Sequence, residues 1–314
     1  MRVSDKTAYI YLFLTMTFWA GNSITARMFA DDLPPLQHAF WRWVIASFVI
    51  LIIFRPPLKR DLPIIWTYRW PVFWIGTTGI GAYNTLQYWA LNYTTVSNVG
   101  LLQTTLPIVL CLLEWLVFKE KITRTQMLGM MVATIGVGVV LIKANLVNLL
   151  HLSFNFGDLI MVGAIFVYGI FSLLIRYSPK QVNQWSFLWV LFVIGALELL
   201  PLQLLEYQAG YRMNLTIGPI LGLSYIIIGP ALLAYKFYTS AVLTLGATRA
   251  GLFFLLVANC FGHISYSDIR GAIANLSPYW LCFGCIWITV RTCKKRGLNL
   301  VLIFIKCLSE IVKR

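Results

Sequence analysis

The chain has 314 residues, of which 59% are hydrophobic and 11% are charged, whereas about 25% of the residues in a typical soluble domain are charged. A soluble protein of this length cannot bury so much apolar surface in one core, so the composition excludes a soluble globular fold. The formal net charge of +14 would suit a nucleic-acid-binding protein, but the basic residues gather between apolar segments on one side of the predicted membrane. That distribution indicates membrane topology and predicts no nucleic-acid partner.

Near-continuous apolar runs of about 20 residues, the length needed to cross about 30 Å of hydrocarbon, predict about ten transmembrane helices. In the first half they cover residues 8–28, 36–54, 72–91, 96–118 and 125–142. In the second half they cover residues 157–175, 185–205 and 217–241, followed by a ninth helix from residue 248 and a tenth that ends near residue 290. The sequence therefore predicts an all-α integral membrane protein.

The basic residues also predict how the helices are oriented, because Lys and Arg gather in the cytoplasmic loops of membrane proteins. With the N-terminus inside, the cytoplasmic side collects most of them, including Lys59, Lys121, Lys180 and a cluster that begins at Arg291. The opposite side keeps few, such as Arg212. Both termini are therefore expected to be cytoplasmic.

Two pairs of segments match each other across the chain. The stretch WALNYTTVSNVGLLQTTLP at residues 89–107 aligns without gaps on SAVLTLGATRAGLFFLLVA at residues 240–258, an offset of 151. In the first helix of each half, FWAGNSITAR pairs with VYGIFSLLIR, which places Trp19 on Tyr168. Each match is short, but together they indicate a duplication.

A duplication with five predicted helices in each half gives one domain at residues 1–145 and a second at residues 146–314. An odd number of spans forces the second copy to enter the membrane upside down. Inverted repeats of this kind are the architecture by which transporters obtain two mirror-related states around a site at the middle of the membrane. The predicted fold is therefore two inverted five-helix repeats.

A resemblance to a known family rests on four stretches: FWAGNSITARM, FWRWVIASFVILIIF, YWALNYTTVSNVGLLQTTLPIVLCLLEWLVFKEKITRTQMLGMMVATIGVGVVLI and ALLAYKFYTSAVLTLGATRAGLFFLLV. On these, the chain resembles the EamA-type members of the drug/metabolite transporter superfamily, most strongly over residues 88–142. The resemblance implies a ten-helix secondary carrier of the bacterial inner membrane that exports amino acids or related small metabolites by alternating access. Its expected partners are the lipid bilayer and a small-molecule substrate, and we expect a monomer or a homodimer.

Arg42 is a candidate for binding that substrate, because charged groups at membrane depth are costly and therefore suspected of function. His38 precedes it by one helical turn on the same face. The functional interpretation is a cation that receives a substrate carboxylate in a central cavity. The alternative is that Arg42 reaches the external interface or forms a fixed ion pair.

Amide and aromatic side chains at helical spacing are further candidates, because they can orient amino and carboxylate groups in a water-filled cavity. The alternative is that they join helices through interhelical hydrogen bonds. They are Trp19 and Asn22 in the first helix, Tyr83, Asn84, Gln87 and Tyr88 in the third, and Tyr235 and Tyr238 in the eighth.

Two carboxylates inside predicted helices, Glu114 and Glu198, are candidates for proton coupling. Glu114 lies about one turn from the cytoplasmic end of its helix, which favours a structural role for it. A coupling role for either residue would make protons a second partner of the carrier.

Two other functional classes compete with a carrier. An integral membrane enzyme usually carries clustered His or carboxylate groups, but the three histidines are scattered here. A channel would need a filter-like loop or a charged ring, and the sequence shows neither. Cys282 and Cys285 form a lone C-x-x-C inside a predicted helix, so we expect ordinary packing, with no metal and no cofactor.

The segment 258–281 breaks the transmembrane pattern, since polar residues follow only about twelve helix-like residues of the ninth helix, where about 20 are needed. The offset of 151 from Glu120 predicts a carboxylate at Gly271. Reading the possible codons one nucleotide forward from Asn259 permits an apolar helix completion followed by a Gly-Glu turn at that position. The sequence therefore predicts a shifted reading frame here, with a genuine polar loop as the alternative. Such a shift would make the product a degenerate, non-functional remnant.

Overall fold

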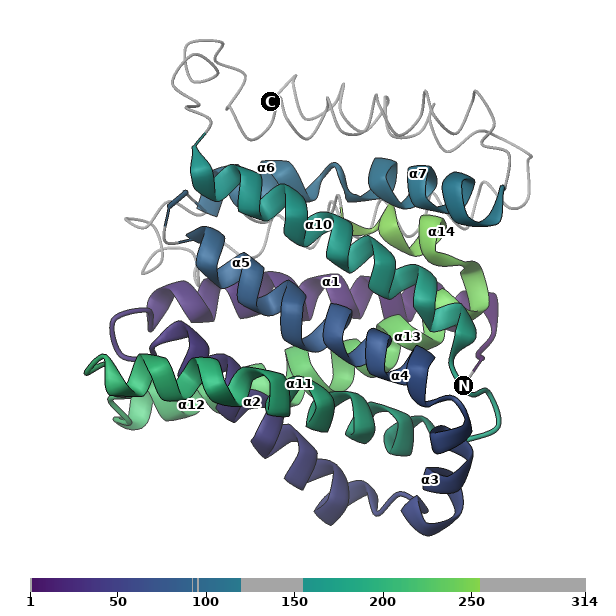
Figure 1. The fold of residues 1–314 in the computed structure, drawn as a ribbon, viewed down its shortest axis with the longest axis horizontal. Coiled ribbons are helices and arrows are strands. Elements are labelled where there is room, and N and C mark those ends of the chain that lie inside the picture. The colour runs from purple at the N-terminus through teal and green to yellow at the C-terminus, as the bar shows by residue number, and fades with distance from the viewer. Residues whose placement is uncertain (1, 92, 95, 120–154, 255–314) are drawn as a thin grey trace.

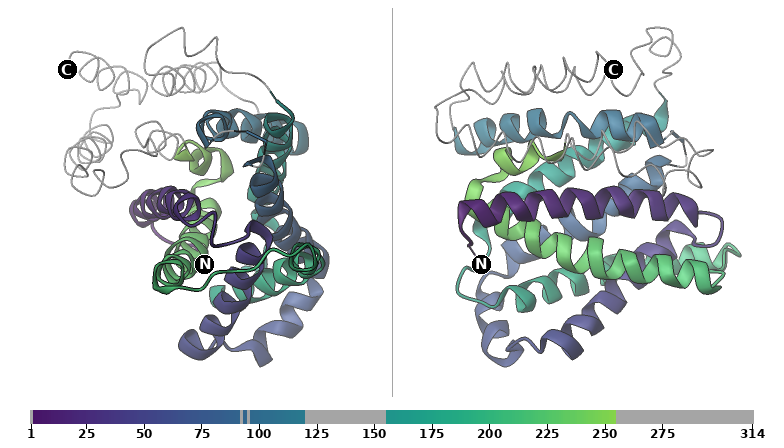
Figure 2. Two further views of the ribbon diagram at one scale, coloured as in Figure 1. Left: turned by 90° about the vertical axis from the view of Figure 1, so that its left-hand side faces the viewer. Right: turned by 180° about the vertical axis from the view of Figure 1, so that it is seen from behind.

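The computed structural model describes residues 2–119, apart from 92 and 95, and residues 155–254. Every regular element among these residues is a helix, which confirms the predicted all-α fold. The helices lie side by side with roughly parallel axes (Figure 1), and a view along them shows several end-on (Figure 2).

Several predictions lie outside the described residues. They are the fifth helix at 125–142, the tenth helix near 290, the later part of the ninth helix, and the segment 258–281 with its shifted frame.

The first half of the chain supplies nine described elements. They are α1 (Asp5–Met28), α2 (Pro35–Val49), η1 (Ile50–Phe54), α3 (Leu58–Thr67), α4 (Arg69–Gly76), η2 (Thr77–Ala82), α5 (Tyr83–Leu91), α6 (Val96–Gln103) and α7 (Leu106–Phe118). The second half supplies seven. They are α10 (Phe156–Leu174), η3 (Ile175–Tyr177), α11 (Gln184–Gln208), α12 (Ile217–Ile226), η4 (Ile227–Leu233), α13 (Ala234–Leu245) and α14 (Ala247–Gly251).

Four continuous helices in the described part are long and apolar enough to cross a membrane, and all four fall on predicted spans. They are Pro35–Phe54, Phe156–Tyr177, Gln184–Gln208 and Ile217–Leu245.

The structure departs from the predicted helices in two places. Helix α3, between the second and third spans, was not predicted, because it is too short and too polar to resemble a span. The span predicted at 96–118 is divided between α6 and α7, and the break lies at Thr104 and Thr105. Pro107 accounts for this break, because it has no N–H to donate to the carbonyl of Gln103 one turn earlier.

Two of the spans widen into π-helical turns near their middles. One is η2, which joins α4 to α5, and the other is η4, which joins α12 to α13. A π-helical turn is rare and frequently found at functional sites. Gly79 allows η2 to approach α10 closely, because a Cβ at this position would lie 2.2 Å from Cδ2 of Phe171.

Helices from the two halves pack against each other throughout the bundle. Helix α1 lies against α13, α2 against α11, and α5 against α10. Large aromatic side chains are fully buried between them, among them Trp43, Tyr168 and Tyr238. These three contacts between halves enclose the polar groups described next.

Candidate functional site

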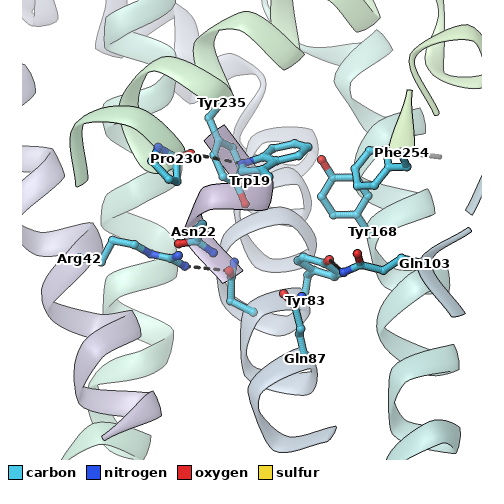
Figure 3. Close-up of a pocket in the computed structure, with 11 residues that line it drawn as sticks. Trp19, Asn22, Arg42, Tyr83, Gln87, Gln103, Tyr168, Pro230, Tyr235 and Phe254 are labelled. Carbon is cyan, nitrogen blue, oxygen red and sulfur yellow. Dashed lines mark hydrogen bonds between the residues drawn. The ribbon is translucent and has the colours of Figure 1, made fainter. Parts of the chain in front are cut away.

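A pocket lies between the two halves of the bundle, and Figure 3 shows its lining. Its walls come from α1, α2, α5, α6, α10, η4, α13 and the residues after α14. The lining residues are Trp19, Asn22, Arg42, Tyr83, Asn84, Gln87, Gln103, Tyr168, Pro230, Tyr235 and Phe254.

Arg42 is buried in the wall of this pocket, with only 3% of its surface exposed. Its Nη2 donates a hydrogen bond to Oδ1 of Asn84 at 2.7 Å, and its Nη1 donates one to the hydroxyl of Tyr88 at 3.3 Å. The guanidinium also lies over the ring of Trp43, 4.3 Å from its centroid. Arg42 therefore points inward and is held by neutral groups, rather than reaching for the membrane interface.

Among the described residues, no carboxylate forms an ion pair with Arg42. The ion pair found in this part of the chain joins Arg60 and Asp61. Its buried Nε also has no hydrogen-bond partner there. A buried cation without an anion is costly, so this guanidinium is suited to receive an anionic group from a ligand.

Asn84 connects Arg42 to the π-helical turn η2. Its Oδ1 accepts from Arg42, while its Nδ2 donates to the carbonyl of Ile80 at 2.8 Å and more weakly to that of Gly79 at 3.4 Å. The hydroxyl of Tyr235, from the other half of the chain, donates to the same Gly79 carbonyl at 2.8 Å. A rearrangement of η2 would therefore displace Asn84 and alter its hydrogen bond to Arg42.

The second π-helical turn takes part in a matching contact. The indole Nε1 of Trp19 donates to the carbonyl of Pro230 in η4 at 3.3 Å, and Figure 3 shows this bond at the upper edge of the pocket. Each π-helical turn thus offers a carbonyl to a ring from the other half of the chain.

Aromatic rings form the far side of the pocket from Arg42. The ring centroids of Trp19 and Phe254 lie 5.4 Å apart, and those of Tyr168 and Phe254 lie 5.3 Å apart. Tyr83 approaches Tyr168 to 4.7 Å and accepts a hydrogen bond from Nε2 of Gln103 at 3.3 Å. Together with Tyr238, 5.2 Å from Trp19, these rings form what we call the aromatic cluster: Trp19, Tyr83, Tyr168, Tyr238 and Phe254.

Seven of the ten residues predicted to bind substrate line the pocket. They are Trp19, Asn22, Arg42, Tyr83, Asn84, Gln87 and Tyr235. The other three, His38, Tyr88 and Tyr238, do not line it.

Each of these three is buried. Tyr88 bonds to Arg42, and the ring of His38 lies 5.9 Å from that of Tyr88. The hydroxyl of Tyr238 forms a hydrogen bond of 2.8 Å with Oγ of Ser172.

Four lining residues were not predicted: Gln103, Tyr168, Pro230 and Phe254. The internal repeat contained a signal for one of them, since Tyr168 aligns with Trp19. At the offset of 151, Pro230 and Phe254 fall on Gly79 and Gln103, neither of which was predicted as a site residue.

The two carboxylates predicted for coupling lie outside this lining. Glu114 accepts hydrogen bonds from the backbone N–H and the hydroxyl of Thr248, so it caps the start of α14 and joins it to α7. Glu198 accepts a hydrogen bond from the hydroxyl of Thr77 in η2. Among the described residues, no group of three or more His, Cys, Asp or Glu is placed to hold a metal ion.

Outside the spans, Asp61 of α3 is buried and joins α3 to the start of α11. It accepts hydrogen bonds from Arg60 Nε at 2.8 Å, the Asn183 N–H at 2.8 Å and Ser186 Oγ at 2.6 Å. Burial raises the pKa of this carboxyl, but these three hydrogen bonds outweigh that effect and hold its pKa below the usual value.

The apolar helical bundle is that of a multi-pass integral membrane protein, and its pocket lies between the two halves of the chain. Residues 6–142 match the sequence model of the EamA-like transporter family. This finding agrees with the resemblance seen in the sequence motifs.

Relatives named as transporters are similar over much of the chain. An uncharacterized transporter of Bacillus subtilis (strain 168), YyaM, is 27% identical over 79% of this chain and 82% of its own length. A protein of Streptantibioticus cattleyicolor named "Probable terminal-alkyne amino-acid exporter" is 26% identical over 61% of this chain and 62% of its own length. A solved crystal structure shares the fold, with a TM-score of 0.61 at 17% identity over 82% of this chain and 86% of that one.

Proposed function

We propose that the protein is a secondary carrier that exports small carboxylate-bearing metabolites, amino acids or closely related compounds, by alternating access. The observation that carries this proposal is Arg42, a buried guanidinium with an open Nε and no carboxylate partner among the described residues. It lines a pocket enclosed by both halves of the chain. A carboxylate accepts hydrogen bonds from a guanidinium in a defined geometry. An anionic substrate would therefore supply both the missing acceptor for Nε and the missing negative charge.

The amide of Asn22 complements this role. Its buried Oδ1 has no hydrogen-bond partner among the described residues, and Figure 3 shows Arg42 pointing toward Asn22. A donor and an acceptor beside each other suit the carboxylate and the ammonium of one α-amino acid. The name of the Streptantibioticus cattleyicolor relative, an amino-acid exporter, favours the same substrate class.

Alternating access requires a site that both halves of the protein can expose in turn. The reciprocal contacts of Trp19 with η4 and of Tyr235 with η2 are suited to this, because each connects a pocket ring to the other half. We place the carrier in a bacterial inner membrane, as a monomer or homodimer with cytoplasmic termini, and assign it no nucleic-acid partner. Glu198 is the residue we propose for proton coupling.

Counterflow in proteoliposomes tests the proposal. Purified full-length protein is reconstituted into vesicles preloaded with unlabelled amino acid, and labelled amino acid is added outside at low concentration. A carrier gives transient accumulation of label that saturates with concentration. Conversion of the probe without accumulation would indicate a membrane enzyme. Absence of any flux from folded protein would indicate a degenerate remnant, and either result would overturn the proposal.

A further inference from the structure

The described lining of the pocket is chemically divided between the two halves of the chain. The first half contributes all of its charged and amide side chains, which are Asn22, Arg42, Asn84, Gln87 and Gln103, together with the rings of Trp19 and Tyr83. The second half contributes aromatic rings and a proline, which are Tyr168, Pro230, Tyr235 and Phe254.

The charged group and most of the rings lie at different ends of the pocket, although the amide of Gln103 lies at the aromatic end and donates to the hydroxyl of Tyr83. Figure 3 shows Arg42 and Asn22 near one side and Tyr168 and Phe254 on the other, with Trp19 between them. A molecule that filled the pocket would therefore meet the charged group at one end and mostly rings at the other.

The charged end presents the two groups that one head group needs. Arg42 Nε is a buried donor and Asn22 Oδ1 a buried acceptor, and neither has a partner among the described residues. In an α-amino acid one carbon separates the carboxylate from the ammonium, so both charged groups must stay at this end. The aromatic cluster is then left for the side chain of the substrate.

The aromatic end offers mostly rings. Of its hydroxyl groups, that of Tyr168 is buried and has no hydrogen-bond partner among the described residues, whereas that of Tyr83 accepts from Gln103. The hydroxyl of Tyr235 is bonded to the carbonyl of Gly79, and that of Tyr238 is bonded to Ser172, both at 2.8 Å. Phe254 has no polar group at all. Close ring-to-ring spacings, such as 5.3 Å between Tyr168 and Phe254, make this end suited to planar or bulky apolar groups.

We infer that the carrier selects carboxylates that bear a bulky apolar or aromatic body, and that Tyr168 and Phe254 determine this selectivity. The inference rests on the proposed function, because Arg42 and Asn22 must hold the head group for the body to reach these two rings. Small polar amino acids would leave the aromatic end unfilled and would be poor substrates. A hydrophobic pocket discriminates by roughly tenfold to two hundredfold for each methylene-sized group.

The test measures exchange in proteoliposomes for glycine, alanine, leucine and phenylalanine, with kcat/KM as the readout. In the wild-type protein we expect kcat/KM to rise from glycine to phenylalanine, by at least about tenfold between alanine and phenylalanine. Tyr168→Ala and Phe254→Ala should each lower the phenylalanine-to-alanine ratio by about tenfold. Tyr168→Phe retains the ring, so it should keep phenylalanine the preferred substrate.

Phe253→Ala is the matched control, because its ring faces Tyr9 at 6.0 Å and does not line the pocket. It should leave the phenylalanine-to-alanine ratio unchanged. Equal losses for alanine and phenylalanine in Tyr168→Ala and Phe254→Ala would overturn the inference. A wild-type preference for glycine betaine, a small quaternary ammonium carboxylate, over phenylalanine would also overturn it, since the rings would then be recognising a cation.

The outcomes separate this inference from the proposed function. If glycine and phenylalanine exchange equally well and both depend on Arg42, the selectivity inference fails while the carrier stands. If no carboxylate exchanges, or if exchange does not depend on Arg42, the proposed function itself fails.

Discussion

Trp19 and Tyr168 meet edge to face across the pocket, with ring centroids 6.0 Å apart and an interplanar angle of 88°. They come from α1 and α10, the first helices of the two predicted repeats, and they are the residues that the internal alignment places on each other. A duplicated chain with its copies facing each other would bring such equivalent residues together. The duplication stays a prediction, and it would also lead us to expect the π-helical turn found in the middle of the third predicted helix of each half.

We predict that Arg42→Ala abolishes counterflow of a carboxylate-bearing substrate while the protein still inserts and folds. Arg42→Lys should also fail, because a compact ammonium cannot reproduce the fork that bonds Asn84 and Tyr88 while leaving Nε for the substrate. The loss should exceed about a hundredfold in kcat/KM, since a charged hydrogen bond and its neighbours act together. The measurement is counterflow with one amino acid found to be transported.

Arg69→Ala is the control, because Arg69 is exposed and lies over the ring of Trp66, 5.9 Å from its centroid, away from the pocket. It should leave counterflow intact. Normal flux in Arg42→Ala would leave Arg42 a structural residue.

Gly79→Ala should destabilise the protein by about 1–3 kcal/mol, as expected for overpacking. The new Cβ would lie 2.2 Å from Cδ2 of Phe171, so η2 and α10 would have to move apart. Thermal unfolding in detergent measures the effect. Gly163→Ala in α10 is the matched control, because a Cβ at Gly163 meets no atom within 4 Å, and it should be neutral or stabilising. A Gly79→Ala protein as stable as Gly163→Ala would show that η2 does not need this close approach.

The length of the apolar runs predicted the described spans well, because a membrane imposes length and hydrophobicity on each helix directly. Helix α3 was not predicted, because it is shorter and more polar than a transmembrane span. Apart from Gln103, the charged and amide residues of the pocket were predictable one by one, since a polar group such as Arg42 stands out in an apolar helix. Tyr168 and Phe254 were not, because an aromatic ring looks the same whether it faces lipid, core or pocket. Only their three-dimensional position separates these cases.

The stability of the contact between α3 and α11 should depend on pH through Asp61. Its folded-state pKa lies below the usual value. Its ionised form therefore stabilises the fold at any pH above about 4, the ordinary pKa of an Asp side chain. That contribution is lost as the pH falls through the lowered pKa. The thermal stability of the wild type should therefore exceed that of Asp61→Asn at pH 7, and the difference should shrink toward pH 3.

Asp5→Asn provides the comparison, because Asp5 is exposed in the first turn of α1. This variant should follow the wild type at both pH values. A difference between wild type and Asp61→Asn that stays constant down to pH 3 would contradict the role given to Asp61.

Glu198→Gln should retain counterflow but lose acceleration by a proton gradient. Glu198 bonds to Thr77 in η2 and forms no ion pair among the described residues, and η2 in turn contacts Asn84 and Tyr235 of the pocket. Loss of its titrating proton would therefore uncouple the gradient from the site without removing the site. Net flux with and without an imposed gradient measures this.

Glu114→Gln is the paired variant, because Glu114 caps the start of α14 at Thr248. It should change thermal stability and keep the response to the gradient. If Glu198→Gln still responds fully to the gradient, the coupling carboxylate is not Glu198.

The last prediction concerns topology. Reporter fusions after Lys59, Lys121, Lys180 and Arg296 should all report the cytoplasm, because Lys and Arg concentrate in cytoplasmic loops. Figure 1 supports a common side for three of the four fusion sites, since α3, the end of α7 and the connection from η3 to α11 lie at the same end of the bundle as the N-terminus. The connection from α11 to α12 lies at the other end, so a fusion at Arg212 should report the outside. External signals at any two of the four cytoplasmic positions would overturn the inverted-repeat arrangement, because an odd number of spans in each half fixes all of these sides together.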